Sequence, residues 1–267
     1  MTAMSTRSKT TWDAVELARH ELRPYSMDYI EMMCDDFFEL HGDRDGGEDH
    51  ALVGGPARMN GKPLMIVAHQ KGRTLEERLY RNYGMAHPEG YRKAMRLMRQ
   101  AERFGMPVLA MIDTPGAYPG VTAERSGQAW AISQSLIVQS DLRVPIVSVV
   151  IGEGGSGGAL ALALGDRVLI MENSIYSVAS PEACAAITWR DATKKREAAE
   201  ALRLTSADAL ALGVVDEVIP EPLPAHEDPE GAARRLATAV HRNLEELSHF
   251  SMERLLGSRY WRFRRPI

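Results

Sequence analysis

The hydrophobic positions of the chain fall into two alternating patterns. Short continuous apolar runs, rich in β-branched residues, occur at 107–112 and 145–151. Runs of this length are typical of strands that are buried on both faces of a parallel sheet. A helix is expected over 88–104, where apolar residues recur at helical spacing, and another over 123–140. The alternation of strands and helices predicts one α/β domain.

Further strands and helices are expected on both sides of this central region of the chain. Segments at 51–58 and 63–69 predict a β-hairpin, because Asn60-Gly61 between them is typical of a tight turn. Ser180-Pro181 marks the start of a further helix. We expect an N-terminal helical segment at 1–22 and one domain over 23–267 that ends in C-terminal helices. The remaining expected helices are at 12–22, 26–40 and 230–247, with two more over 193–212 that meet near Thr205-Ser206. The remaining expected strands are at 167–171, 175–178 and 214–219.

The apolar run at 145–151 leads into the most glycine-rich stretch of the chain, GEGGSGGA at 152–159. We expect the strand to end at 151, a glycine turn to follow, and a short buried helix to contain Leu160. Glycine lets the backbone approach a ligand closely. The N–H groups at a helix start have no partner within the helix and carry the positive end of its dipole. Such a turn suits an oxygen that becomes negative during a reaction.

Two nucleotide-binding motifs overlap this stretch. The spacing G-x-G-x-x-G occurs at 152–157, and Glu172 follows at the distance of a ribose-binding acid. The match lies mid-chain, however, and its helix meets Gly165 too early for a full crossover helix, so a dinucleotide site is disfavoured. A phosphate-binding loop is disfavoured further, because Gly158-Ala159 occupy the positions of its Lys-Ser/Thr pair.

Residues 154–158 also fit G-x-S-x-G, in which Ser156 would be the nucleophile of a serine hydrolase. That mechanism needs an acid and then a histidine further along the chain. The remaining histidines are His226, His241 and His249, all in polar C-terminal stretches. The alternative to all of these functional motifs is a glycine turn that only packs the helix against the strand.

A second rigid loop, DTPGAYPG at 113–120, follows the other buried strand. Ligands of α/β folds gather at the carboxyl ends of strands, so we expect the two loops to face one crevice. Asp113 and Glu153 are the acidic candidates, and we expect each to hold its loop through hydrogen bonds to backbone. His69 and His87 stand alone, and a packed or surface role is favoured for both. Backbone donors without a side-chain catalyst point to oxyanion stabilisation.

Composition narrows the class of protein. The 267 residues are 45% hydrophobic and 25% charged with a net charge of −4, which does not favour nucleic acid as a partner. No apolar run reaches about 20 residues, the length of a membrane span, and the N-terminus has no signal core, so we expect a cytoplasmic protein without membrane contact. Cys34 and Cys184 form no disulfide framework or zinc cluster. The arginine-rich tail at 259–265 fits an acidic partner surface or a solvated terminus.

A set of longer motifs between 23 and 222 resembles the carboxyltransferase α subunit of the multisubunit, bacterial-type acetyl-CoA carboxylase. The region covers about three quarters of the chain, and together the motifs are far more specific than a lone G-x-G-x-x-G. They are RPY (23–25), VGG (53–55), HQKGR (69–73), RNYGM (81–85), PEGYRKA (88–94), residues 112–121, residues 150–163, YSV (176–178) and SPE (180–182).

The resemblance implies an α/β fold of the crotonase-like (ClpP/crotonase) class, a superhelix of ββα units. It also implies a heterotetramer of two α and two β subunits, in which a separate zinc-ribbon β chain holds acetyl-CoA and the α chain lines the biotin side. The reaction implied moves CO₂ from carboxybiotin on a biotin carboxyl carrier protein to acetyl-CoA, forming malonyl-CoA. It belongs to an ATP-dependent complex that supplies fatty-acid or specialised polyketide synthesis. Biotin is attached to the carrier, and no metal is expected in this chain.

By the same resemblance, the backbone N–H groups of Gly157 and Gly158 form an oxyanion hole. Loss of CO₂ leaves charge on the biotin ureido oxygen, which those donors would stabilise. The ureido nitrogen then acts as the base, and this explains the missing side-chain base. Lys71 and Arg73 are expected to attract the carboxylate. The other residues expected to bind biotin or shape its pocket are Gly116, Ala117, Tyr118, Gly155 and Ala159.

The chain departs from the family pattern at Thr122, Ser126 and Ala183, and it is expected to lack most of the family's N-terminal helical extension. These departures fit a specialised carboxylase or another acyl-CoA substrate. The alternative from a different class is a stand-alone crotonase-like acyl-CoA hydratase or isomerase, which needs a positioned carboxylate beside bound CoA. A third alternative is a non-catalytic scaffold subunit, and the intact Gly157 and Gly158 argue against it.

Overall fold

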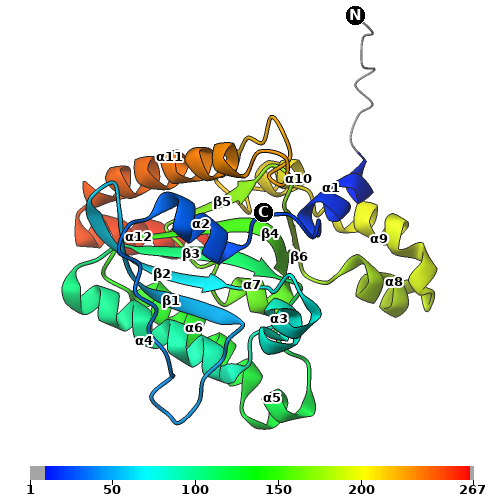
Figure 1. Ribbon diagram of the computed structural model, residues 1–267, viewed down its shortest axis with the longest axis horizontal. Coiled ribbons are helices and arrows are strands. Elements are labelled where there is room, and N and C mark those ends of the chain that lie inside the picture. The colour runs from blue at the N-terminus through cyan, green and yellow to red at the C-terminus, as the bar shows by residue number, and fades with distance from the viewer. Residues whose placement is uncertain (1–9, 265–267) are drawn as a thin grey trace, which may run out of the picture.

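The computed structural model describes residues 10–264, which fold around a single twisted sheet (Figure 1). The strand order is β1-β2-β3-β4-β5-β7, with β6 paired to the far end of β4. The first two strands are antiparallel and the other pairings are parallel. The strands are β1 (Leu52–Met59), β2 (Lys62–His69), β3 (Val108–Thr114), β4 (Ile146–Gly155), β5 (Arg167–Met171), β6 (Ile175–Ser177) and β7 (Glu217–Ile219).

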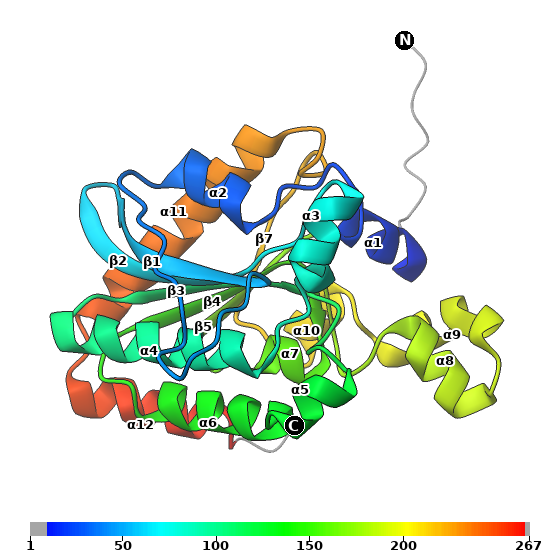
Figure 2. The ribbon, with the colours of Figure 1, turned by 60° about the horizontal axis from the view of Figure 1, so that its bottom comes forward.

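Helices cover both faces of the sheet. Figure 2 shows α2 and α11 on one side and α4 and α6 on the other, while α8 and α9 project away from the sheet. The α-helices are α1 (Thr11–Ala18), α2 (Ser26–Met33), α3 (Leu75–Tyr80), α4 (Pro88–Phe104), α5 (Val121–Arg125), α6 (Gln128–Asp141), α7 (Ser156–Leu160), α8 (Pro181–Trp189), α9 (Lys195–Leu202), α10 (Ser206–Ala211), α11 (Pro229–Ser248) and α12 (Met252–Arg262).

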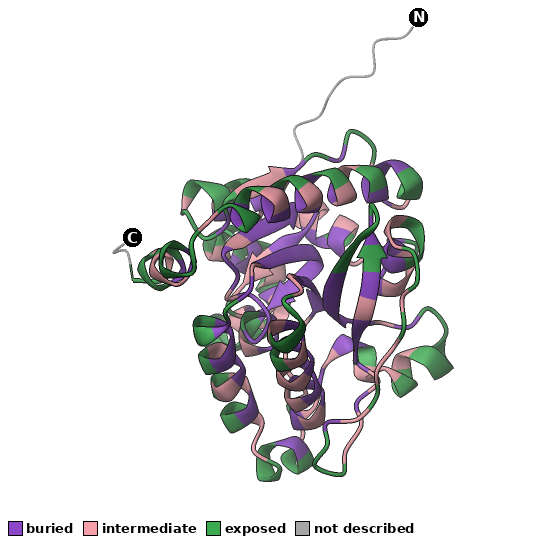
Figure 3. Ribbon diagram, turned by 90° about the vertical axis from the view of Figure 1, so that its left-hand side faces the viewer, coloured by how far each residue is buried: buried purple, intermediate pink, exposed green. Residues whose placement is uncertain are grey.

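The strands divide their side chains between two apolar layers. On β3, Val108, Ala110 and Ile112 pack into the layer that contains α4 and α6, whereas Leu109 and Met111 pack into the layer that contains α2 and α11. Every residue of β3 and β4 is buried, which is why their sequences read as continuous apolar runs. Figure 3 shows these strands as the buried centre of the molecule.

Local signals in the sequence gave several elements correctly. The hairpin between β1 and β2 turns through Asn60 and Gly61, which have φ values of 51° and 74°, as a tight hairpin turn requires. The helix predicted at 88–104 is α4, which begins with Pro88 at its first turn and ends at Gly105 in the left-handed conformation. Each of these signals depends only on residues close in sequence, so the sequence alone locates the hairpin and the helix.

The helix predicted at 26–40 is wrong beyond Met33, where α2 ends. Residues 34–40 run beside β1 instead: the Phe38 N–H donates to the Pro56 carbonyl at 3.0 Å, and the Leu40 N–H donates to the Gly54 carbonyl at 2.8 Å. Because β1 is the edge of the sheet, its backbone groups would otherwise lack partners. Coverage of the edge therefore overrides helical propensity in this segment.

Two other predicted helices are shorter than expected. The first ends at Ala18 rather than at 22, and residues 1–9 of the expected 1–22 segment lie outside the described residues. The helix expected at 123–140 is divided into α5 and α6 by Gly127, whose φ of 83° lies outside the helical region. The break follows directly after the loop at 113–120 and gives α6 its own direction.

The C-terminal helix α12 holds a buried cation that the sequence did not reveal. Arg259 is 1% exposed and donates both to the Asp166 carboxylate, at 2.7 and 2.9 Å, and to the backbone carbonyls of Gln139 and Leu142. The expectation of a solvated or surface-binding tail is therefore wrong for Arg259, and Arg265 lies outside the described residues.

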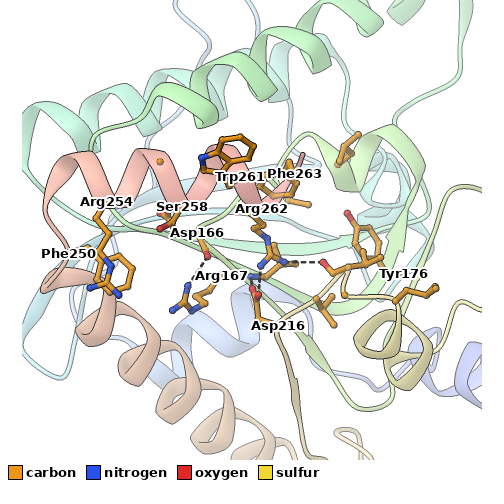
Figure 4. Close-up of a pocket in the computed structure, with 18 residues that line it drawn as sticks. Asp166, Arg167, Tyr176, Asp216, Phe250, Arg254, Ser258, Trp261, Arg262 and Phe263 are labelled. Atoms are coloured by element: carbon orange, nitrogen blue, oxygen red, sulfur yellow. Dashed lines mark hydrogen bonds and ion pairs between the residues drawn. The ribbon is translucent and has the colours of Figure 1, made fainter. Parts of the chain in front are cut away.

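A cavity of about 1070 Å³ lies between α12 and β5 (Figure 4). Arg262 pairs with Asp216 at this cavity and also donates to the Val214 carbonyl at 3.1 Å. These two contacts attach α12 to the segment that directly precedes β7. Within residues 10–264, no helix is long and apolar enough to cross a membrane.

Candidate functional site

The glycine stretch at 152–159 begins as a strand and not as a turn. β4 continues to Gly155 and pairs there with β6, so the first four residues of G-x-G-x-x-G, 152–155, are extended. The expectation that the strand ends at 151 is wrong for this reason. A dinucleotide turn is not formed, and Glu172 accepts the Glu221 backbone N–H at 2.6 Å.

The chain reverses at Ser156, which has a φ of 51°. A left-handed conformation is uncommon for a residue with a side chain and is often found at functional sites. Ser156 begins the short helix α7, which includes Gly157 and Gly158 in its first turn. The N–H groups of a first helical turn have no acceptor within the helix. The backbone therefore reaches the site as a sharp turn with unpaired helix-start donors.

The residues around Ser156 do not form a nucleophile elbow. Within residues 10–264, no histidine hydrogen-bonds to Ser156, and the downstream His226 stacks instead on His20, with ring centroids 3.6 Å apart. Leu160 at the end of α7 is 40% exposed, so the expectation of a wholly buried helix is wrong at this position. The next leucine along, Leu162, is fully buried.

The structure brings the two glycine loops into direct backbone contact. A Cβ on Gly158 would lie 2.5 Å from the Ala117 nitrogen and 2.6 Å from the Gly116 carbonyl carbon. A Cβ on Gly155 would overlap the Pro115 carbonyl. Only glycine fits at either position, because the obstructing atoms are backbone. These contacts confirm that the loops at 113–120 and 152–159 lie together, and their shared crevice stays a prediction.

The loop at 113–120 is itself held rigidly. The Thr114 hydroxyl donates to the Gly116 carbonyl at 2.7 Å and accepts the Gly116 N–H at 3.1 Å. The Tyr118 N–H donates to the Ala86 carbonyl at 3.0 Å, and the Tyr118 ring stacks on His87 with centroids 4.0 Å apart. His87 is therefore a packed residue, as expected, and it supports the far end of the loop.

Three charged side chains meet where β3 and β4 approach the turn. The Lys71 ammonium lies 2.7 Å from Asp113 Oδ1 and 2.8 Å from Glu153 Oε2. The Glu153 N–H also donates to Asp113 Oδ1, at 2.9 Å. Asp113 thus holds backbone as expected, whereas the Glu153 carboxylate binds side chains instead. Burial alone would raise the pKa of Glu153, but Lys71 and Arg19 lower it to about 2.

The network extends outward through an arginine that the sequence did not indicate. Arg19, directly after α1, donates to Glu153 Oε1 at 2.7 Å and to the Glu182 carboxylate of α8 at 2.8 Å. Nothing in the spacing of the predicted helix at 12–22 distinguishes Arg19 from a surface arginine. A cavity of about 220 Å³ beside the network is lined by Arg19, Lys71 and Glu153, with Tyr25, Tyr83 and Pro115 among its other walls.

The two basic residues expected to attract a carboxylate have other partners. Lys71 is almost buried within the network, and burial alone would lower its pKa, but Asp113 and Glu153 raise it above its usual range. Arg73 pairs with Asp28, donates to the Glu21 carbonyl at 3.1 Å and lies over the Tyr25 ring. Both cations therefore have structural partners that the sequence could not show.

The other expected residues are placed around this centre. Ala159 is fully buried in α7 and belongs to the apolar layer with α4 and α6. His69 is fully buried, so the expectation of a packed histidine is confirmed. No group of histidine, cysteine or acidic residues that could hold a metal occurs in the part of the chain that the structure describes. The site consequently consists of backbone turns supported by a buried charge network.

Known proteins of one family resemble this chain over almost its whole length. A family model described as "Acetyl co-enzyme A carboxylase carboxyltransferase-like" matches residues 2–266. The acetyl-coenzyme A carboxylase carboxyl transferase subunit alpha of Thermus thermophilus is 57% identical over 256 residues, covering 96% of this chain and 81% of that protein. The protein of the same name from Geobacter metallireducens is 55% identical over 255 residues, covering 95% and 80%.

The fold also resembles a solved carboxyltransferase structure. The transcarboxylase 12S hexamer core, solved with methylmalonyl-coenzyme A and methylmalonic acid bound, matches with a TM-score of 0.66 and 25% identity. The match covers 87% of this chain and 44% of that chain, so this chain spans less than half of that protein.

Proposed function

Because the chain belongs to the acetyl-CoA carboxylase carboxyltransferase alpha-subunit family, we propose that it forms the biotin side of a divided carboxyltransferase site. Family membership makes the chain a carboxyltransferase alpha subunit with a crotonase-like fold. The proposed reaction transfers CO₂ from carboxybiotin to acetyl-CoA and yields malonyl-CoA. The observation that carries this assignment is the contact of Gly158 with the Gly116–Ala117 backbone, which only glycine permits.

The proposed catalytic groups are the backbone N–H groups of Gly157 and Gly158. They begin α7, where the helix has no internal acceptor for them. A Cβ on Gly157 would meet only Ile132 Cδ1 at 3.6 Å, so this side of the turn has space for a group of methyl size. When bound, carboxybiotin supplies the CO₂ and a ureido nitrogen that can serve as the base. Preorganised donors at a developing negative charge typically contribute about 2.7–4 kcal/mol each.

The remaining expected residues would shape the pocket around these donors. Gly116, Ala117 and Tyr118 form the loop against which Gly158 packs, and Gly155 and Ala159 flank the turn. Lys71 and Arg73, expected to attract a carboxylate, have their charges engaged by acidic side chains. We therefore assign carboxylate attraction a smaller role than the turn itself.

Partners complete the proposed site. We propose a zinc-ribbon β subunit that holds acetyl-CoA, an arrangement of two α and two β subunits, and a biotin carboxyl carrier protein that delivers the carboxyl group. The complex would consume ATP in a separate step and would work in the cytoplasm to supply fatty-acid or specialised synthesis. The word alpha in the names of the relatives supports a multisubunit enzyme.

The hydratase or isomerase alternative has a structural weakness. Such an enzyme needs an available carboxylate beside the oxyanion donors. The acidic groups next to the turn are Asp113 and Glu153, and both are bound by Lys71. Family membership and this ion pairing together favour carboxyl transfer.

The direct test is malonyl-CoA-dependent carboxylation of free biotin, with and without a zinc-ribbon β-type subunit. We expect turnover with both chains present and none with this chain alone, because this chain has one oxyanion turn of this kind among its described residues. Turnover by the single chain would refute the divided site. Hydration of a crotonyl-type thioester without carboxyl transfer would instead support the alternative.

A further inference from the structure

The charge network lies directly before the catalytic turn in the chain. Glu153 is three residues from Ser156, and Asp113 is three residues from Gly116. Lys71, which follows β2, bridges their carboxylates while being only 12% exposed at its side chain. A buried ammonium therefore lies between two carboxylates, each three residues before the segment in which the two glycine loops meet.

The sheet needs this bridge because its regular pairing fails there. β3 and β4 pair in register up to Ile112 and Val150, but the next pair is Thr114 with Gly154, which leaves β4 with extra residues. The Glu153 N–H donates to Asp113 Oδ1 at 2.9 Å rather than to a backbone carbonyl of β3. The Asp113 side chain thus takes the place of the missing ladder bond.

A glycine makes room for this side-chain bond. A Cβ on Gly152 would lie 2.5 Å from Asp113 Oδ1. Lys71 in turn pairs with two carboxylates, which are 2% and 10% exposed, and Arg19 provides a second cation for Glu153. Without the ammonium, the Asp113 carboxylate would be buried without an ion partner among the described residues and would face the Glu153 carboxylate at the end of the adjacent strand. The separation of the strand ends, and so of the two loops, depends on this charge balance.

We propose that Lys71 and Asp113 are positioning residues that set the distance between the catalytic turn at 155–158 and the loop at 113–120. This role rests on the proposed function, and it replaces contact with substrate as the task of Lys71. In this role neither side chain needs to contact the reacting atoms, because the two charges are paired with each other. Both act through the backbone of β3 and β4, which carries the two glycine loops.

The test compares Lys71→Met, Lys71→Arg and Asp113→Asn with a matched control, Asp166→Asn. Asp166 also forms a buried ion pair, with Arg259, and accepts the Ile146 N–H at 2.8 Å, but it lies at the opposite end of β4. The first measurement is amide hydrogen exchange in the peptide 151–162, in the intact chain. The protected amides in that peptide include those of Glu153 and Ala161.

We expect Lys71→Met to increase exchange in this peptide by about tenfold or more, since the turn loses its anchor. Lys71→Arg should restore most of the protection, and Asp113→Asn should fall between the two because its oxygen can still accept the Glu153 N–H. Asp166→Asn should lower the unfolding temperature without a selective change at 151–162. If Lys71→Met does not fold, the comparison of Asp113→Asn with Asp166→Asn tests the proposal, again by amide hydrogen exchange in the peptide 151–162.

The second measurement uses the complex with its β-type partner. Lys71→Met should reduce kcat for biotin carboxylation by about tenfold or more, while KM for malonyl-CoA stays close to wild type. The proposal would be overturned if folded Lys71→Met or Asp113→Asn exchanged at 151–162 as slowly as the wild type. It would also be overturned if Asp166→Asn increased exchange there as much as these variants do. A wild-type complex that transfers no carboxyl group would count against the proposed function, whereas the exchange comparison would still decide this inference.

Discussion

Gly158 lies against Ala117 with no space for a side chain between the two backbones: a Cβ on Gly158 would stand 2.5 Å from the Ala117 nitrogen. Its neighbour Gly157 has a different environment, in which a Cβ would meet only Ile132 at an ordinary contact distance of 3.6 Å. The two adjacent glycines are therefore not equivalent. Gly158 is required for the contact between loops, and Gly157 is required only if its open side receives a ligand.

This asymmetry predicts different outcomes for two matched variants. Gly158→Ala should reduce turnover per assembled complex by about 10²-fold, because its methyl group displaces the turn from the loop and misaligns the oxyanion donors. Gly157→Ala keeps its N–H and meets no backbone, so it should lose far less. Turnover of complexes purified by size exclusion is the measurement. Equal turnover of both variants would contradict this account.

A buried leucine provides the stability control for these variants. Leu162 is fully buried, unlike the exposed Leu160. Leu162→Ala should lower the free energy of unfolding by about 2–5 kcal/mol. The folded fraction should keep its turnover, because Leu162 is not part of the turn. Denaturant unfolding and turnover measured on the same preparation separate loss of fold from loss of catalysis.

Ser156 should be dispensable for chemistry. No histidine in the described part of the chain hydrogen-bonds to its side chain, and the residue is exposed at the reversal of the chain. Ser156→Ala should therefore retain most carboxyl transfer. A fluorophosphonate probe should leave Ser156 unlabelled. A thousandfold loss in the variant together with labelling of the wild type would revive a serine hydrolase.

The buried pair of Arg259 and Asp166 should contribute to stability and not to turnover. Arg259→Met removes the cation and leaves the Asp166 carboxylate buried without its ion partner, which typically costs about 3–5 kcal/mol. The double variant Arg259→Met/Asp166→Asn should recover part of that loss, because no buried charge remains. Urea unfolding of the wild type, the two single variants Arg259→Met and Asp166→Asn, and the double variant measures both effects. An additive double variant would show that the two side chains act independently.

His69 should make stability depend on pH. Burial, together with the nearby Lys71, lowers the pKa of His69 to about 3 in the folded chain, against an ordinary value of 6.5. A histidine whose folded pKa is lowered is protonated first in the unfolded state. Its contribution is therefore complete above about pH 6.5 and is lost as the pH falls toward 3, by up to about 1.4 kcal/mol per pH unit.

Urea unfolding between pH 5 and 7.5 tests this dependence. Carboxylates with ordinary pKa values keep their charge over most of this range, so they add little to the change of stability with pH. His69→Gln should flatten the slope even if it lowers overall stability. His249→Gln, at an exposed histidine, should keep the wild-type slope. A slope that is the same in all three proteins would show that His69 does not govern stability in this range.

The sequence by itself determined the elements whose signals are local. Asn60-Gly61 specified a hairpin, because both residues accept positive φ. Pro88 and Gly105 bracketed a helix, because proline fits a first helical turn and glycine fits a left-handed end. Continuous apolar runs gave β3 and β4 as buried strands, and the motifs between 23 and 222 gave the family.

Tertiary structure alone decided which residues depend on distant partners. Residues 34–40 became extended because the edge of β1 needed backbone partners, although their local pattern favoured a helix. Arg259 is buried because Asp166, 93 residues away in the chain, receives it. The difference between Gly157 and Gly158 comes from a loop forty residues earlier in sequence, at Gly116–Ala117. Spacing along the chain carries no information on such contacts, since they depend on how the completed sheet brings separate loops together.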